Sequence, residues 1–145
     1  ARPVPSFAGG RASSDIVLAE DRDGTWRRGT QRLAPLPGHV VPANALFRVY
    51  HEVYGATAGD PLIITLTIAP GTDPSVLGAL RSLVARRAAL SLIFREQADT
   101  RDGVTALPRT VTANLEPGSY VLMITVVNER TGETAEARTP LVVVR

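Results

Sequence analysis

The sequence contains no cysteine and no lysine, few aromatic residues and no long apolar run. The absence of cysteine excludes disulfide scaffolds, cysteine nucleophiles and cysteine-based zinc sites. No apolar stretch approaches the roughly 20 residues that a helix needs to cross a bilayer. The first ten residues also lack the apolar centre of a signal peptide, so an exported protein would have lost its signal from this chain. The 145 residues therefore predict one globular domain with a short arm.

All 16 basic residues are arginine, and they set a net charge of +2 and a pI near 9.7. A nucleic-acid-binding face needs its basic residues clustered, whereas these are scattered with acids between them. We therefore expect no nucleic-acid partner. The two densest groups are better interpreted as protein contact patches, because arginine is favoured at interfaces. These groups are Trp26, Arg27 and Arg28 with Arg32, and Arg81 with Arg86 and Arg87.

Residues 1–14 have the Pro, Gly and Ser content of an arm, and residues 15–145 have the patterning of a folded domain. Val4 and Phe7 are the main apolar residues of the arm, and their burial contributes only about 3–6 kcal/mol. Ordering fourteen residues costs on the order of 1–2 kcal/mol each. We therefore expect the arm to need contacts on another chain, with Phe7 and the prolines as anchors.

Short apolar runs separated by turn residues predict strands along most of residues 15–145. Prolines make residues 25–44 mostly irregular, and residues 74–88 are ambiguous, with a short helix favoured over a strand. With at most one helix, the pattern predicts an all-β, immunoglobulin-like antiparallel β-sandwich. The expected strands cover 15–20, 46–54, 62–68, 89–95, 107–115, 120–127, 134–138 and 141–144, with 120–127 central and with turns at 100–103 and 128–133.

The segment from Leu115 to Tyr120 resembles the tyrosine corner of Greek-key sandwiches. Leu115 precedes the turn made by Pro117 and Gly118, and the Tyr120 hydroxyl is expected to bond a backbone group within residues 114–118. Leu122 stands where an antibody domain has cysteine, so the chain is not an antibody-type domain.

Residues 46–54 alternate with a period of two, which puts Arg48, Tyr50, Glu52 and Tyr54 on one face. One interpretation is a half-exposed partner patch, and the other is a solvent face with amphipathic packing. The predicted partner-binding residues are Val4, Phe7, Trp26, Arg27, Arg28, Arg48, Tyr50 and Tyr54.

No catalytic, cofactor-binding or metal-binding residue is predicted. The two histidines, His39 and His51, are expected in a loop and in a strand, far apart. The segment Asp21–Gly24 resembles the start of a calcium-binding loop. It lacks the later acidic ligands of such a loop, so a simple turn is favoured. The sequence has no Gly-x-Ser-x-Gly elbow and no phosphate-binding glycine loop.

Three segments, in this order, resemble the C-terminal β-sandwich region of bacterial GWxTD-domain proteins, over roughly residues 13–144. They are Ser14–Ala19, Val49–Tyr54 and Leu115–Tyr120, and the hairpin at 130–135 fits as well. The Gly-Trp-x-Thr-Asp motif itself is absent, so its role does not transfer. The resemblance implies export to the periplasm or another extracytoplasmic space. The chain is also similar to an accessory subunit of some bacterial photosynthetic reaction-centre–antenna assemblies.

Together these features predict a non-catalytic interaction or structural subunit, docked on the extracytoplasmic side of a larger membrane-associated complex. The alternative is a carbohydrate- or ligand-binding sandwich of an exported protein, which would present exposed aromatic residues on a concave face.

Overall fold

The computed structural model describes residues 13–28, 30–71 and 89–145. The helix expected over 74–88, and Val4 and Phe7 of the arm, lie outside the described residues. The end of the expected arm is joined to the domain, because Ser13 forms an isolated bridge with Val53. The Glu52 N–H also donates to Ser14 Oγ at 2.9 Å.

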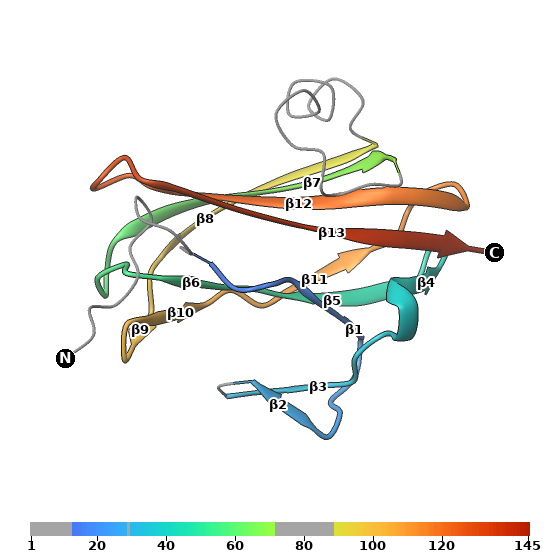
Figure 1. The fold of residues 1–145 in the computed structure, drawn as a ribbon, viewed down its shortest axis with the longest axis horizontal. Helices are drawn as coiled ribbons and strands as arrows, with labels where there is room; N and C mark the ends of the chain where they lie inside the picture. The colour runs from blue at the N-terminus through green and yellow to red at the C-terminus, as the bar shows by residue number, and fades with distance from the viewer. Residues whose placement is uncertain (1–12, 29, 72–88) are drawn as a thin grey trace.

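One layer is a five-stranded sheet in the order β4-β13-β12-β7-β8 (Figure 1). Its strands are β4 (Val40–Pro42), β7 (Pro61–Pro70), β8 (Leu90–Gln97), β12 (Gly118–Asn128) and β13 (Thr134–Val144). The expected central strand at 120–127 is confirmed, since β12 pairs with both β13 and β7. The two strands expected at 134–138 and 141–144 are one continuous strand, β13, which also pairs in parallel with β4.

The facing layer is made of two three-stranded sheets, β1-β5-β11 and β6-β10-β9. Its strands are β1 (Val17–Glu20), β5 (Leu46–Tyr50), β6 (Glu52–Tyr54), β9 (Thr100–Arg101), β10 (Val104–Ala106) and β11 (Arg109–Thr112). The strand expected over 46–54 is thus divided at His51, and the strand expected over 107–115 is confined to β11. Asp102 and Gly103 form the expected turn between β9 and β10, and both have positive φ, as a two-residue hairpin turn requires.

A third element lies outside the second layer (Figure 1). It is the hairpin of β2 (Trp26–Arg28) and β3 (Gln31–Leu33). The expectation that residues 25–44 are mostly irregular is therefore wrong in part. The prolines at 35, 37 and 42 stand outside the hairpin or at a sheet edge, where they do not interrupt a ladder. A 3-10 turn, η1 (Pro37–His39), connects the hairpin to β4.

The main core lies between the two layers and is almost entirely aliphatic. Residues on alternate positions of β5, β7 and β12 contribute fully buried side chains, including Phe47, Leu62, Leu66, Ile68, Leu122 and Val126. This arrangement confirms the predicted antiparallel β-sandwich.

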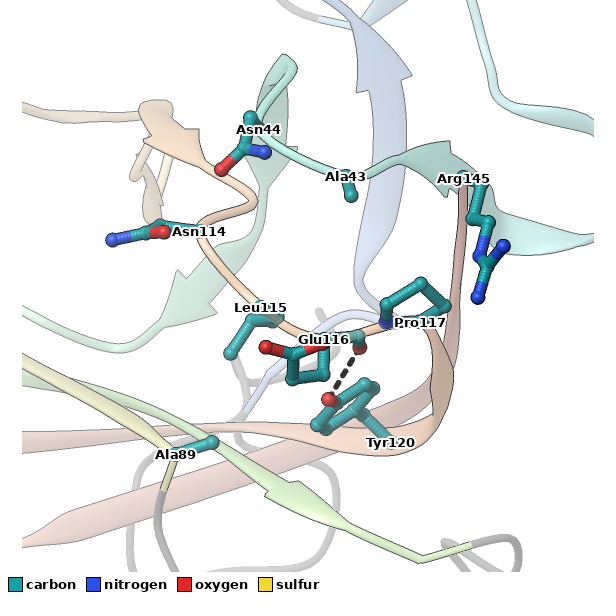
Figure 2. A pocket seen from close by; sticks show the side chains of 9 residues that line it. All are labelled: Ala43, Asn44, Ala89, Asn114, Leu115, Glu116, Pro117, Tyr120 and Arg145. Carbon is teal, nitrogen blue, oxygen red and sulfur yellow. Dashed lines mark hydrogen bonds between the residues drawn. The ribbon is translucent and has the colours of Figure 1, made fainter.

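The predicted tyrosine corner is present at the start of β12. The Tyr120 side chain is 7% exposed, and its hydroxyl donates to the Glu116 carbonyl at 2.6 Å (Figure 2). The predicted hydrogen bond to residues 114–118 is therefore confirmed.

Candidate interaction surface

The β2–β3 hairpin covers Tyr50 at the end of the outer face of β5. Cross-strand register places Leu33 opposite Trp26 and Gln31 opposite Arg28, so these four side chains share the inward face of the hairpin. Leu33 packs with Tyr50 and Ala19 in a second small core, in which Tyr50 is 1% exposed. The expectation of a half-exposed Tyr50 is therefore wrong. The hairpin, which local sequence did not indicate, covers the ring.

Glu52 of β6 is the centre of a polar cluster at the rim of this small core. The Tyr50 hydroxyl donates to Glu52 Oε2 at 2.7 Å, and Arg28 Nη2 lies 3.0 Å from Oε1. The Tyr54 hydroxyl is 3.4 Å from the same Oε1. Burial, followed by the hydrogen bond to Glu52, raises the pKa of Tyr50 above its usual 10.0. Burial and the charge of Glu52 also raise the pKa of Tyr54, so both hydroxyls stay protonated and act as donors at neutral pH.

Arg28 links this cluster to the exposed rim of the hairpin. Its guanidinium carbon lies 5.6 Å from the centre of the Trp26 ring, within cation–π range. Trp26 remains 41% exposed, although it lies on the inward face of the hairpin. Arg28 thus contacts both Glu52 and the Trp26 ring, and it connects the exposed ring to the polar cluster.

The outward face of the hairpin carries two arginines directly opposite each other. Arg27 pairs in register with Arg32, and both are exposed. Side chains opposite each other across two strands are about 5 Å apart at Cβ, where like charges are destabilising. Neither arginine has an ion-pair partner among the described residues. The hairpin therefore presents a concentrated, uncompensated positive charge.

Arg48, one of the predicted partner-binding residues, forms ion pairs within the chain. Its guanidinium lies 3.0 Å from Asp23 Oδ1 and 3.3 Å from Asp21 Oδ1, both in the turn from β1 to β2. The hydrogen bond to Asp23 raises the pKa of Arg48. Arg48 therefore attaches this turn to β5, and the acids that open like a calcium loop are its ion-pair partners.

Gly24, in the same turn, allows the turn to pack directly against the backbone at the end of β3. A Cβ placed on Gly24 would lie 2.1 Å from the Leu33 carbonyl oxygen. No side chain fits there, so the base of the hairpin depends on glycine.

Two adjoining hollows, of about 350 and 450 Å³, run between the hairpin and strands β10 and β11. Both are lined by Gln31, Tyr50 and Pro108. Their remaining lining is of mixed charge and includes Asp23, Arg48, Arg101, Asp102 and Arg109. This groove borders the hairpin and places further charged and polar side chains beside it.

A separate open hollow of about 580 Å³ lies at the tyrosine corner (Figure 2). Its polar lining comes from Asn44, Asn114, Glu116 and Arg145. Tyr120 is the one aromatic residue among the described residues that line it, and its hydroxyl is already bonded to the Glu116 carbonyl. The described lining thus offers amide and charged groups and no exposed aromatic ring.

The two histidines occupy unlike environments. His39 Nδ1 lies 3.0 Å from the Pro140 carbonyl and 2.8 Å from Thr139 Oγ1. His51 is fully buried, and burial lowers its pKa to about 4. Within the described residues, no three His, Asp or Glu side chains gather as a metal site would require.

The structure thus brings together most of the predicted partner-binding residues. Trp26, Arg27 and Arg28 of β2 lie beside Arg48 and Tyr50 of β5 and Tyr54 of β6. Sequence reasoning missed the central role of Glu52 and the burial of Leu33. The alternation over residues 46–54 put Glu52 on the correct face but could not show which segment covers it.

No protein-family model and no curated protein sequence matches this chain. Among solved structures, the chain is similar to the PmoD soluble domain from Methylocystis sp., with 14% identity, 89% of each chain covered and a TM-score of 0.43. It is also similar to the C-terminal domain of wzt, with 13% identity, 94% of this chain and 76% of that chain covered and a TM-score of 0.48. The third is the CARDB domain of the PF1109 protein, in complex with di-metal ions, from Pyrococcus furiosus. It shows 14% identity, 97% coverage of each chain and a TM-score of 0.41. At these identities and TM-scores the similarities bear on neither activity nor partner.

Proposed function

We propose that this chain is a non-catalytic interaction subunit that docks through the β2–β3 hairpin on an acidic surface of a larger protein assembly. The observation that carries the proposal is the exposed Arg27–Arg32 pair on the outward face of the hairpin, with the partly exposed Trp26 ring on the opposite face of the same strand. Tryptophan and arginine are the residues most enriched among those that dominate binding energy at protein interfaces. A carboxylate between the two arginines would relieve their mutual repulsion, so binding would be favoured by charge complementarity.

Pre-organisation of the surface supports the same function. Arg28 is held by Glu52 at 3.0 Å and by the Trp26 ring, so little side-chain entropy remains to be lost on docking. The Glu52 carboxylate is occupied by Arg28 and the two tyrosines, which suits a structural role better than proton transfer. We therefore also propose that the chain has no catalytic activity.

The proposed host is a membrane-associated complex on its extracytoplasmic side, by resemblance to the sandwich of GWxTD-domain proteins and to an accessory subunit of photosynthetic reaction-centre–antenna assemblies. Among the described residues, no helix is long and apolar enough to cross a membrane. Val4 and Phe7 remain a predicted second contact.

The test is charge reversal on the outward face of the hairpin. Arg27→Glu with Arg32→Glu is expected to abolish copurification of the tagged full chain with its native assembly. Binding of the unaltered chain should weaken with added salt, because the attraction is screened over about 8–10 Å at physiological ionic strength. The control is Arg95→Glu on β8 of the five-stranded sheet, whose side chain is 70% exposed and lines neither hollow beside the hairpin. Equal copurification of the double variant and the control would disprove docking through the hairpin.

The alternative is a ligand-binding module that uses the hollow at the tyrosine corner. Its support is the cluster of Asn44, Asn114, Glu116 and Arg145 around about 580 Å³ of open space, a volume within the range of small-molecule sites. Titration of neutral oligosaccharides against the labelled protein by NMR tests it. Shifts confined to the hollow and lost in Asn114→Ala would favour this function, and an unchanged spectrum would count against it.

A further inference from the structure

Strand β8 (Leu90–Gln97) leaves one edge of the five-stranded sheet uncovered by any described residue. It pairs with β7 alone in the described part of the chain. The other described edge strands are short: β2, β3, β4 and β6 have three residues each, β1 and β11 have four each, and β9 has two. β13 pairs with β4 only at Val142–Val144, and Ser13 and His39 contact the Glu136 and Pro140 carbonyls along the rest of that side. With eight residues, β8 is the longest of the described edge strands. A long edge strand is a template for pairing with another strand.

The hydrogen-bonding direction of the open edge follows from its pairing with β7. The Ala98 N–H donates to the Asp60 carbonyl, and the register continues with Glu96 opposite Leu62 and Phe94 opposite Ile64. Even-numbered residues therefore bond to β7. In an antiparallel ladder the intervening residues direct N–H and C=O to the other side. Ser91, Ile93, Arg95 and Gln97 thus offer their backbone groups to the open edge.

Both faces of β8 carry apolar side chains that its single neighbour leaves partly uncovered. On the outer face, Ile93 is 66% exposed, the highest value among the exposed large hydrophobic residues described. On the inner face, Leu90, Leu92 and Phe94 are only partly buried against the core. The Arg109 guanidinium covers Phe94 at 4.7 Å and lies 2.8 Å from Glu96, so a charged side chain closes this side of the sandwich.

We propose that β8 of one molecule pairs antiparallel with β8 of a second copy of this chain, about a two-fold axis at Ile93, which joins two five-stranded sheets into one. At this axis the two Ile93 residues exchange both backbone hydrogen bonds and their side chains touch. Leu92 of each copy then lies opposite Phe94 of the other, and Ser91 lies opposite Arg95.

A second copy fits this edge because the strand is complementary to itself in this register. The axis at Ile93 gives apolar pairs on both faces and places no like charges opposite each other. An axis at Arg95 or Glu96 would oppose two identical charges, which is destabilising. The interface lies on the sheet edge and is separate from the hairpin used in the proposed function, so the two proposals can fail independently.

Single cysteines test the register, since the chain has no cysteine of its own. In Ile93→Cys, the two Cα atoms would be about 5.5 Å apart, within the reach of a disulfide. In the matched control Arg95→Cys, they would be offset by four residues, about 14 Å at about 3.4 Å per residue along the strands, and out of reach. Under mild oxidation, Ile93→Cys is expected to form a covalent dimer and Arg95→Cys to stay monomeric. Equal cross-linking of both, or of neither, would overturn the proposal.

Sedimentation of the purified full chain tests the dimer without any disulfide. The unaltered chain is expected to dimerise, and Ile93→Arg should weaken the dimer at least about tenfold, because two arginines would then meet at the axis. Leu46→Arg, at a residue that is 50% exposed on β5, is expected to leave the dimer unchanged. A monomeric unaltered chain would disprove pairing between copies, and is expected if β8 instead accepts a strand of some other protein. An Ile93→Arg variant that still dimerises would disprove it as well.

Discussion

At the residue scale, His51 is a buried titratable group that has no hydrogen-bond partner among the described residues. Both of its ring nitrogens are enclosed and unbonded, and burial lowers its pKa from 6.5 to about 4. Between these two pH values, the unfolded chain binds more protons than the folded chain. The free energy of unfolding must therefore fall as the pH decreases from about 6.5 to about 4, by roughly 3 kcal/mol at most.

The measurement is urea denaturation at pH 7.5 and at pH 5, with His51→Leu as the comparison. Leucine removes the proton-binding group and leaves no polar atom buried, so this variant is expected to lose less stability at pH 5 than the unaltered chain. Identical losses in both proteins would show that His51 does not set the pH dependence.

Tyr120 is the residue on which the corner depends. Tyr120→Phe removes the donor to the Glu116 carbonyl and is expected to lower the free energy of unfolding by about 1–2 kcal/mol. Tyr54→Phe is the comparison, because its 3.4 Å contact with Glu52 is long for a hydroxyl hydrogen bond. If the two variants were equally stable, the corner hydrogen bond would contribute no more than an ordinary rim contact.

At the scale of elements, Asp60 fastens the loop before β7 to the hairpin between β12 and β13. Its carboxylate accepts hydrogen bonds from Asn128 at 2.8 Å, from Arg130 and from the Thr57 N–H at 2.9 Å. The hydrogen bond from Arg130 is the main cause that lowers the pKa of Asp60, so this contribution is present at neutral pH and lost in acid. Asp60→Asn is expected to cost about 2–3 kcal/mol in thermal or urea unfolding at pH 7. Asp99→Asn, at a side chain that is 83% exposed, should cost little.

The position of the β2–β3 hairpin depends on the absence of a side chain at Gly24. Gly24→Ala would drive a Cβ into the Leu33 carbonyl, which displaces the hairpin and is expected to cost about 1–3 kcal/mol. Binding to the native assembly should weaken with it, whereas Thr25→Ala, at the exposed neighbouring residue, should change neither. A Gly24→Ala variant with unchanged unfolding and binding would mean that the close approach has no consequence.

At the scale of the whole molecule, the described cores are built from residues between Ile16 and Val143. Deleting residues 1–12 is therefore expected to leave the unfolding transition of the sandwich nearly unchanged and to weaken assembly with its partner. Circular dichroism and copurification of the truncated chain measure the two effects. Full binding by the truncated chain would remove Val4 and Phe7 from the proposed interface.

Local patterns in the sequence determined most of the long strands and the turns, but not the β2–β3 hairpin. The aligned alternate residues of 62–68 predict β7, because alternate residues of a strand face opposite sides of a sheet. The run over 120–127 is apolar on both faces, which predicts the central strand β12. Asp102–Gly103 and Pro117–Gly118 mark turns, since few residues adopt the backbone angles that turns need. The corner hydrogen bond was predictable for the same reason: it joins residues only four positions apart.

Only the tertiary structure decided what covers each face. The alternation of 46–54 put Tyr50 and Glu52 on one side, but the burial of Tyr50 depends on Leu33, and the ion pair of Glu52 depends on Arg28. The break at His51 and the open edge of β8 likewise depend on which strands become neighbours. These contacts join residues far apart in the chain, and their energy comes from packing that no local window of sequence contains.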